Sequence, residues 1–331
     1  MKAIIPVAGV GKSLRPHTFT QPKPLILVAG KPIISFILDE LIQVGIDEYV
    51  FIIGYMGDKI QSFIETHYPN IKAEYVVQEQ RFGLGHAIWT ARNTFKKEDQ
   101  ILIVLGDTIF DVDLKEMLKH HQSVLGVKKV NDPRHFGVVE FGDDGYLVKV
   151  VEKPSIPKSN MAMVGLYLIH EVVELIEALN YIIENQSMTR DEYQLTDALM
   201  RMIDKGTKFH TLEVRNWFDC GKKDILLETN AILLKRKHYQ QNETPHFEHS
   251  IIIPPVSIGE NCIIENSIIG PNVTIGSNSK IESSIIRESI IGHFSHLDEV
   301  TLYFSIVGHD SSIKGLRQSL NIGDHTEIDF S

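Results

Sequence analysis

Isoleucine recurs at intervals of five or six residues from about residue 250, and this repeat limits the possible folds of that region more than any other feature. Gly or Glu directly follows each repeating residue, as in I-G-E-N and I-E-N-S, and these residues are Ile258, Ile264, Ile269, Ile275 and Ile281. A hexad with one inward apolar position is typical of a left-handed parallel β-helix, in which three short strands close each triangular coil. At about eighteen residues per coil, the remaining chain makes roughly four coils. The repeat therefore predicts a β-helix. The β-helix sequence itself shows no catalytic motif.

Up to about residue 235 the chain follows another pattern, in which apolar β-rich runs alternate with segments of helical periodicity. The runs that indicate strands are 49–53, 72–77, 101–105, 123–130 and 161–168. A helix is expected to begin at Pro32 and to end at Gly45. This alternation is typical of an α/β fold with a mostly parallel sheet and helices on both faces.

Two further segments organise the chain. Residues 136–141 and 146–151 are separated by Gly-Asp-Asp-Gly and predict a β-hairpin, inserted into the α/β pattern as a substrate-contacting element would be. The polar stretch R-K-H-Y-Q-Q-N-E-T-P-H-F contains a proline and predicts a linker. We therefore expect a catalytic domain over 1–240 and the β-helix over 241–331.

Residues 1–24 combine an apolar run, a glycine-rich turn and nearby cations, which together predict a phosphate site. Gly9 and Gly11 permit tight turns, and successive backbone amides in such a turn favour anions. The G-x-x-x-x-G-K-[ST] loop is a poor match because Pro6 stands in place of its first glycine. The dinucleotide fingerprint G-x-G-x-x-G fails because Leu14 replaces its third glycine. What remains is A-G-x-G-x-x-L-x-P-x-T, followed by P-K-P-L.

The charge of the chain argues against several classes of partner. There are 33 Lys and Arg against 43 Asp and Glu, so the formal net charge is −10 and neither nucleic acid nor an anionic membrane is expected as a partner.

No apolar run reaches the length of about eighteen residues that would cross a bilayer, and the apolar N-terminal stretch is too short for a signal peptide. Cys220 and Cys262 are far apart and lack metal-ligand spacing, as expected in a reducing compartment. We expect a cytoplasmic protein that acts on small molecules.

Two aspartates follow predicted strands. Asp107 comes directly after the buried run I-L-I-V-L, and Asp219 occupies a similar place in W-F-D-C-G. Ligands bind at the carboxyl ends of strands in open α/β sheets. Mg²⁺ typically takes one or two protein carboxylates and completes its shell with phosphate oxygens and water. The pair therefore predicts a Mg²⁺ site, although a single aspartate after a strand is more often a cap or turn residue.

These motifs together resemble those of the sugar-phosphate nucleotidyltransferases over about residues 1–235. The N-terminal pattern is joined by Q-E-Q-R-F-G-L-G-H-A, by H-F-G-V-V-E-F, by V-E-K-P and by D-E-Y-Q-L-T-D. Within the family, the chain is most similar to the glucose-1-phosphate thymidylyltransferase branch, in the long form that adds a left-handed β-helix. The resemblance implies a Rossmann-like core and transfer of a nucleotidyl group from dTTP or UTP to a sugar-1-phosphate, by default glucose-1-phosphate, with release of pyrophosphate.

The resemblance also implies roles for individual residues. Lys23 would neutralise the nucleotide phosphates, and Asp107 with Asp219 would bind Mg²⁺. We add Arg15 as a catalytic candidate because it lies two residues beyond the position of the loop arginine that this chain lacks. The nucleotide-binding residues would be Ala8, Gly9, Gly11, Lys12, Gln78 and Gly83, with Gln78 at the pyrimidine edge. A buried amide can donate and accept hydrogen bonds, which suits the imide of uracil or thymine. The residues that would hold the sugar and its phosphate are Gly137, Glu152 and Lys153.

One departure from the family pattern leaves alternatives open. The family has Thr-Arg after the second loop glycine, whereas this chain has Lys12 and Ser13, and only Arg15 or Lys12 could replace the missing arginine. A lysine does not reproduce the planar fork of arginine. A catalytically weak sensor or structural subunit that binds sugar nucleotides is therefore a second hypothesis. Acyl transfer on the β-helix, with His293 or His309 as base, is a third. The resemblance does not decide between dTTP and UTP, and it does not identify the sugar. It also leaves open the number of subunits in the expected homo-oligomer.

Overall fold

A computed structural model describes residues 1–96, 100–236 and 246–315. The chain divides into two compact units, Met1–Thr229 and Asn230–Ser331. The domain boundary expected at residue 240 falls within 237–245, outside the described residues. None of the described helices is both long enough and apolar enough to cross a bilayer.

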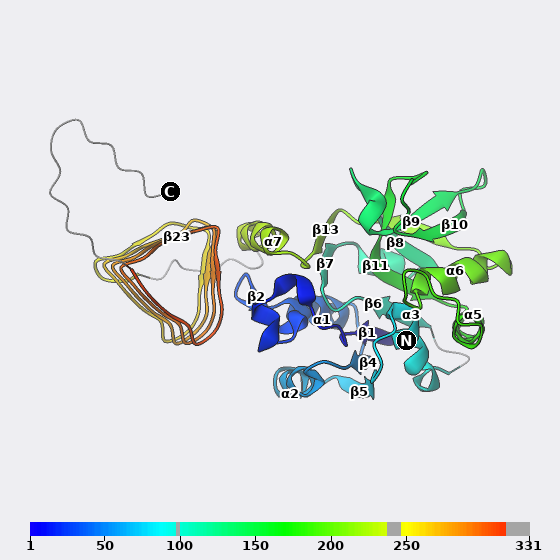
Figure 1. Cartoon of the computed structure of the whole chain (residues 1–331), viewed down its shortest axis with the longest axis horizontal. Coiled ribbons are helices and arrows are strands. Elements are labelled where there is room, and N and C mark those ends of the chain that lie inside the picture. Colours follow the sequence, from blue (N-terminus) through cyan, green and yellow to red (C-terminus); the bar gives the residue numbers. More distant parts are fainter. Residues whose placement is uncertain (97–99, 237–245, 316–331) are drawn as a thin grey trace. The chain divides into compact units, whose positions relative to one another are not determined.

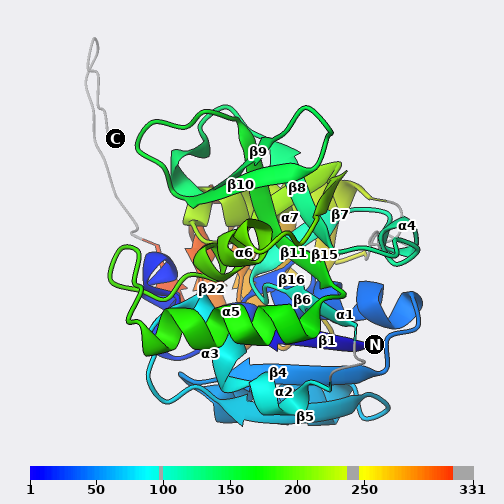
Figure 2. The ribbon, with the colours of Figure 1, turned by 90° about the vertical axis from the view of Figure 1, so that its right-hand side faces the viewer.

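A mixed sheet forms the centre of the first unit, and within the described residues it contains nine strands (Figure 1). Seven of them lie in the order β10 (Leu147–Glu152), β9 (Gly137–Phe141), β11 (Met161–Ile169), β6 (Ile101–Val104), β1 (Lys2–Pro6), β4 (Glu48–Ile53) and β5 (Lys72–Val77). The other two are β8 (Val124–Lys129), which pairs with β11, and β12 (His210–Glu213), which pairs with β8. Figure 2 shows β10 and β5 at opposite edges.

The direction of the strands defines where a ligand can bind. Strand β1 is parallel to both of its neighbours, β4 and β6, whereas β11 runs antiparallel to β6. The chain passes from β1 to β4 and β5 on one side and returns to β6 on the other side. Such a reversal opens a crevice at the carboxyl end of the central strand. The predicted strands and the mostly parallel sheet are confirmed.

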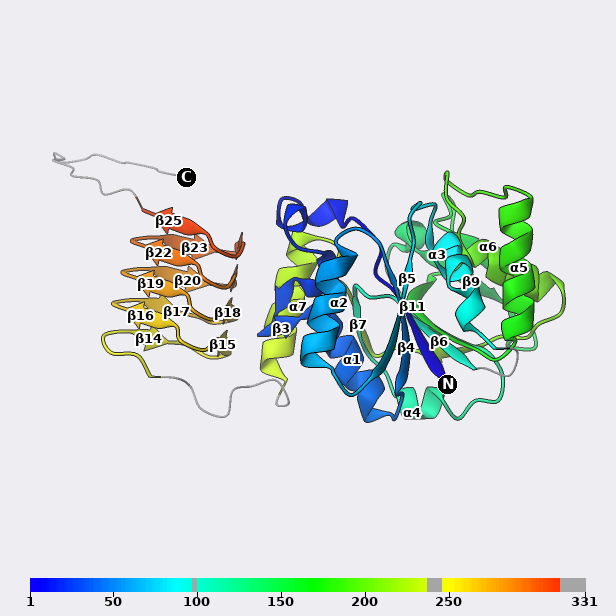
Figure 3. The same ribbon diagram turned by 90° about the horizontal axis from the view of Figure 1, so that it is seen from below.

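Helices cover both faces of this sheet (Figure 3). On one face lie α1 (Ile33–Gln43) and α2 (Gly57–His67), and on the other lie α3 (Leu84–Thr90), α5 (Val172–Glu184) and α6 (Leu195–Asp204). The short α4 (Leu114–Met117) follows β7, and α7 (Lys223–Lys235) spans the boundary between the two units. Helix α1 begins directly after Pro32, and Gly45 follows its end with φ +87°, as predicted.

Alternating side chains of the parallel strands supply two separate apolar cores. Ile4 of β1 packs with the α3, α5 and α6 side, whereas Ile5 packs with the α1 and α2 side, and neither is exposed. Strands that are buried on both faces read as continuous apolar runs, which explains why the sequence shows no polar alternation there.

One hairpin lies at the edge of the main sheet of the first unit, and two small strand pairs lie outside that sheet. The predicted hairpin is confirmed as the antiparallel pair of β9 and β10, with Gly137 opposite Glu152. The other two pairs are both antiparallel and are β7 (Thr108–Asp111) with β13 (Asn216–Asp219) and β2 (Leu27–Val28) with β3 (Lys31–Pro32). Asp107 directly precedes β7 and Asp219 ends β13, so this small pair brings the two predicted metal ligands to the same place.

The second unit is a left-handed parallel β-helix with a triangular outline (Figure 1). Its described strands form three parallel sheets of four strands each. They are β14 (Ile251–Ile252), β17 (Ile268–Ile269), β20 (Ile285–Arg287) and β23 (Thr301–Tyr303); β15 (Val256–Ile258), β18 (Val273–Ile275), β21 (Ile290–Ile291) and β24 (Ile306–Val307); and β16 (Ile263–Glu265), β19 (Lys280–Glu282), β22 (His296–Asp298) and β25 (Ser312–Lys314). The four predicted coils are confirmed.

Each coil is shorter than the eighteen residues that three full hexads would give. Hydrogen-bonded positions on successive coils are 17 residues apart in the first coils and 16 apart in the later ones. The inward residues show why: Ile258 and Ile264 are six apart, but Ile264 and Ile269 are only five apart. The corners between strands hold residues with positive φ, among them Asn261 and Asn278. Asparagine tolerates this left-handed conformation better than most residues.

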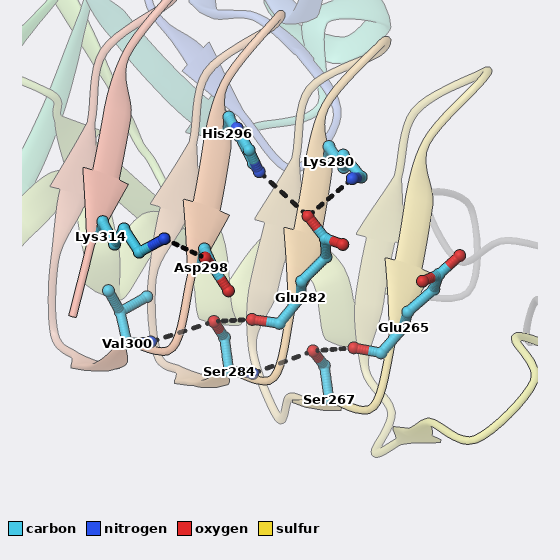
Figure 4. Close-up of polar contacts among 9 residues, drawn as sticks. All are labelled: Glu265, Ser267, Lys280, Glu282, Ser284, His296, Asp298, Val300 and Lys314. Atoms are coloured by element: carbon cyan, nitrogen blue, oxygen red, sulfur yellow. Dashed lines mark hydrogen bonds and ion pairs between the residues drawn. The ribbon is translucent and has the colours of Figure 1, made fainter. Parts of the chain in front are cut away.

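Polar side chains join the coils at the corners (Figure 4). The Ser284 hydroxyl donates to the carbonyl of Glu282 at 2.6 Å and accepts the backbone N–H of Val300 at 3.2 Å. Ser267 makes the same pair of contacts one coil earlier, with the carbonyl of Glu265 and the N–H of Ser284. Each serine therefore satisfies a buried amide of the next coil, which fixes the register of the stack.

We expect Ser284→Ala to destabilise the β-helix by about 1–3 kcal/mol, because the buried N–H of Val300 would lose its acceptor. Ser284 is 1% exposed, so water cannot replace the hydroxyl. Denaturant titration followed by circular dichroism measures the change. Ser312→Ala, at an exposed position of β25, is the matched control. Equal midpoints for the two variants would contradict the role given to Ser284.

Candidate active site

A cavity of about 640 Å³ opens at the carboxyl end of β1. Its wall consists of the loop from Pro6 to Ser13, of Lys23 and Pro24, of side chains between Gln78 and Ala87, and of Leu105, Gly106, Asp107 and Glu192. This is the crevice that the strand order predicts. It brings together all the residues that the sequence assigned to nucleotide binding, namely Ala8, Gly9, Gly11, Lys12, Gln78 and Gly83, and also Lys23, to which the sequence assigned a catalytic role.

The glycine-rich loop presents bare backbone to this cavity. Gly11 has φ +65°, and a Cβ there would lie 2.9 Å from the Cγ2 of Thr18. The Thr18 hydroxyl donates to the Gly11 carbonyl at 2.8 Å, which holds the turn. A Cβ on Gly9 would meet nothing within 4 Å, so the space beside this residue is open. Lys12 begins a 3₁₀ helix of only three residues, in agreement with the rejection of the G-K-[ST] loop.

Lys23 lies between the two aspartates. Its Nζ is 2.5 Å from Oδ2 of Asp107 and 3.7 Å from Oδ1 of Asp219, and the lysine is only 9% exposed. Burial alone lowers the pKa of Lys23, but the two carboxylates outweigh it and the pKa is raised overall. Burial, and then repulsion from Asp107, raise the pKa of Asp219, and Lys23 opposes them. One cation is thus held in reach of two carboxylates at the floor of the crevice.

A second cavity, of about 280 Å³, adjoins the first. Leu84, Leu105, Asp107 and Glu192 line both of them. The second cavity contains the three residues assigned to the sugar phosphate, Gly137, Glu152 and Lys153, and also Asp219. The two predicted groups of site residues therefore face one continuous space, with Asp107 at the junction.

Neighbouring elements hold the Glu152–Lys153 pair in place. The Thr196 hydroxyl, on α6, donates to Oε2 of Glu152 at 3.2 Å, and Lys153 Nζ lies 3.4 Å from Oε1. A Cβ on Gly137 would lie 2.4 Å from the Cε of Met163 and 3.1 Å from the Cγ2 of Thr196. A larger residue here would displace the flexible end of Met163 and press on Thr196, so the hairpin packs closely against this wall. The segment D-E-Y-Q-L-T-D leads into α6, and Glu192, Gln194 and Thr196 line the second cavity.

Gly83 serves a purpose that the sequence did not indicate. It is among the residues that the sequence assigns to nucleotide binding, but a Cβ there would also lie 2.6 Å from the carbonyl oxygen of Tyr193. Its φ is +105°, and the N–H of Gly85, two residues further on, donates to the same carbonyl at 2.8 Å. The start of α3 is thus docked against the segment that leads into α6.

We expect Gly83→Ala to lower the stability of the first unit by more than about 1 kcal/mol, because backbone strain and a backbone clash act together. Gly145 is the matched control, since it has φ +79° but a Cβ there would meet nothing within 4 Å. Gly145→Ala therefore adds strain without a clash. Thermal unfolding of both variants measures the difference. A larger loss in Gly145→Ala would contradict the docking role of Gly83.

The structure separates Arg15 from the other predicted residues. Arg15 lines neither cavity, and its guanidinium lies over the ring of Phe19, 4.7 Å from the centroid. The short 3₁₀ helix ends before it and directs it away, whereas Lys12 and Ser13 remain in the wall of the larger cavity.

Sequence reasoning missed two cations. Arg81 lines the larger cavity, and the guanidinium of Arg190 donates to the backbone carbonyl of Lys153 at 2.6 Å. Arg81 stands inside the quoted motif Q-E-Q-R-F-G, so its charge was a visible signal. Arg190 carried no such signal, because its contact with residue 153 depends on the tertiary fold.

The comparisons with known proteins agree with this geometry. The family described as "Nucleotidyl transferase" matches residues 2–236. A glucose-1-phosphate thymidylyltransferase of Streptomyces antibioticus is 30% identical over 96% of this chain and 90% of its own length. A bifunctional protein GlmU of Methanococcus maripaludis is 37% identical over 71% of this chain. This chain spans only 55% of that relative's length.

A solved structure extends the likeness to three dimensions. UDP-glucose pyrophosphorylase complexed with UDP-glucose matches with a TM-score of 0.61 and 25% identity, covering 71% of this chain and 99% of that one. The family match covers more than half of the chain, and the thymidylyltransferase relative is similar over nearly its whole length. The chain belongs to the nucleotidyl transferase family, with relatives of the sugar-1-phosphate type.

Proposed function

We propose that this protein transfers a nucleotidyl group from UTP or dTTP to a sugar-1-phosphate, with glucose-1-phosphate as the first candidate, and releases pyrophosphate. One observation carries the proposal. The cavity with the bare glycine loop and Lys23 shares Asp107 with the cavity of Glu152 and Lys153. A nucleotide in the first space and a sugar phosphate in the second would meet at this junction. The thymidylyltransferase and pyrophosphorylase relatives support the choice of substrates.

The reaction needs little more than positioning and charge neutralisation. An anionic oxygen of the sugar phosphate forms a bond to the α-phosphorus of the nucleotide, and the bond from this phosphorus to the departing pyrophosphate breaks. No side-chain nucleophile is required, because the attacking oxygen is already ionised. The obstacle is repulsion between two anions, and oriented cations lower such a barrier. In this proposal, Lys23 neutralises the nucleotide phosphates, and Lys153 holds the sugar phosphate beside Glu152.

The two aspartates fit Mg²⁺. Both carboxylates lie within 3.7 Å of the same nitrogen, so oxygens from two elements are close enough together to share one Mg²⁺ beside Lys23. The described residues contain no third acidic, histidine or cysteine ligand there, which suits an ion that keeps phosphate and water in its shell. When bound, the metal would supply charge neutralisation for the phosphates. Asp107 and Asp219 would hold it. We further propose that the protein acts in the cytoplasm and as a homo-oligomer.

Pyrophosphate release tests the proposal directly. The purified chain is incubated with Mg²⁺, each of several nucleoside triphosphates and each of several sugar-1-phosphates. We expect the fastest release with UTP or dTTP and glucose-1-phosphate. Nucleotide binding without release for any pair would instead support the sensor hypothesis.

The presence of Lys12 and Ser13, where the family has Thr-Arg, leads to a separate prediction. We expect Lys12→Ala to lower kcat/KM by about tenfold to a hundredfold, as the loss of a charge-assisted contact worth about 1.5–3 kcal/mol implies. Arg15→Ala, outside both cavities, is the control and should change kcat/KM less than about threefold. Ser13→Arg, in the cavity wall, should raise turnover by adding a planar clamp. Severe impairment of Arg15→Ala with a neutral Lys12→Ala would reverse these assignments.

A further inference from the structure

The side chain of Gln78 is held at the wall of the larger cavity. It follows β5, its backbone N–H donates to the carbonyl of Ile53 at 2.8 Å, and it is only 4% exposed. A buried amide must find partners for its two N–H groups and its oxygen, or lose free energy. Which of these atoms is left for a ligand therefore decides what the residue can recognise.

The carbonyl of Gly83 determines how the amide is turned. Nε2 of Gln78 lies 3.2 Å from this oxygen. A carbonyl only accepts hydrogen bonds, so the amide oxygen could not take this place without repulsion. The Gly83 carbonyl also accepts the N–H of Ala87 at 3.1 Å, and the N–H of Tyr193 donates to the preceding carbonyl, that of Phe82, at 2.7 Å, so this acceptor is held in place.

The same nitrogen lies 3.0 Å from Nδ1 of His86. An amide nitrogen cannot accept a hydrogen bond, so Nδ1 must be the acceptor and the ring proton must be on Nε2. Aromatic neighbours hold the ring, with Tyr193 stacked at 6.3 Å between centroids and Phe82 edge-on at 5.5 Å. Burial lowers the pKa of His86, which favours the neutral ring.

Gly83 and His86 thus take both amide hydrogens of Gln78. The only polar group that the side chain can still offer is its accepting oxygen. His86 is absent from the wall of the cavity, so it can act on a ligand only through Gln78.

We propose that His86 is a positioning residue that makes Gln78 an acceptor-only reader of the nucleobase, so that the site selects bases with a ring N–H and rejects cytosine. Uracil and thymine donate an N–H at position 3, which the oxygen of Gln78 can accept. Cytosine has a lone pair there, and the two acceptors would repel each other. This inference rests on the proposed function, because it assumes that a nucleotide occupies the larger cavity.

Two substitutions separate the hydrogen bond from packing. His86→Leu removes the acceptor but keeps an apolar side chain among the aromatic rings. His86→Asn places an amide oxygen near the position of Nδ1 and so restores an acceptor. Calorimetric binding of UTP and CTP to the full chain is the first readout, and pyrophosphate release with glucose-1-phosphate is the second.

We expect the wild-type chain and His86→Asn to prefer UTP over CTP, and His86→Leu to lose about tenfold or more of this preference. In turnover, His86→Leu should raise KM for UTP while kcat changes less than about twofold, because the contact acts on binding alone. Equal preference in the wild type and His86→Leu overturns the proposal, and so does a wild type that does not distinguish the two nucleotides.

A third measurement needs no variant. Nitrogen-15 NMR of the histidines in the wild-type chain distinguishes the two ring tautomers, and the proposal requires His86 protonated on Nε2. Protonation on Nδ1 at neutral pH overturns it even if His86→Leu fails to fold. Binding preference without pyrophosphate release would sink the proposed reaction but leave the role of His86 standing, so the two failures can be told apart.

Discussion

Lys23→Met is expected to reduce the rate of pyrophosphate release by about a hundredfold to a thousandfold, the usual loss for one oriented group that stabilises transition-state charge. Lys23 is 9% exposed and lines the larger cavity, where its Nζ is 2.5 Å from Asp107, a residue that lines both cavities. Its removal also leaves Asp107 and Asp219 facing each other without compensation. Steady-state kinetics at saturating substrates measures the loss. Methionine keeps most of the apolar stem, so the chain should still fold.

Lys205→Met is the matched control for this experiment. Lys205 forms an exposed ion pair with Glu177, with 2.9 Å between nitrogen and oxygen, and it lines neither cavity. Exposed pairs of this kind contribute little to stability, so the control should retain full turnover. If Lys23→Met kept more than about a tenth of the rate while folded, another cation would have to neutralise the nucleotide.

Asp219→Asn and Asp107→Asn are each expected to abolish pyrophosphate release at low Mg²⁺. Each change removes one anionic oxygen ligand while keeping the shape of the side chain, so metal affinity should fall while the fold persists. A titration of rate against Mg²⁺ concentration should show a much higher half-saturation for both variants. The change at Asp107 should be the more severe, because this residue lines both cavities.

Asp298→Asn provides the comparison for these two variants. Asp298 lies on the β-helix, where its Oδ2 is 3.3 Å from Nζ of Lys314 (Figure 4). Its replacement should leave the Mg²⁺ dependence unchanged. Wild-type rates at low Mg²⁺ in both active-site variants would refute the metal assignment.

Much of this site could be predicted from sequence because its residues follow strands. Asp107 and Asp219 are far apart in the chain, yet both end or follow β elements, and the carboxyl ends of such elements converge. The direction of Arg15 could not be predicted, since it depends on where a three-residue 3₁₀ helix stops. The contact of Gln78 with His86 depends on the path of the intervening turn and on its docking against Tyr193.

In the β-helix, too, some features could be predicted from the sequence and one could not. The spacing of isoleucines predicted its handedness, its faces and its number of coils. The coil length was overestimated because one side of a 17-residue coil, and two sides of a 16-residue coil, are one residue shorter than a hexad. Ile264 to Ile269 is such a side, and only the stacked register reveals that it recurs.

The repeated serine contacts between coils have a consequence for how such a chain can change in evolution. Successive coils contact each other through equivalent positions such as Ser267 and Ser284. A duplication of one complete coil would supply its own serine and its own inward isoleucines, and every junction would be preserved. An insertion of two residues within a strand would instead misplace every later side chain of that coil. Natural length variation in this part of the chain is therefore expected to come in whole turns.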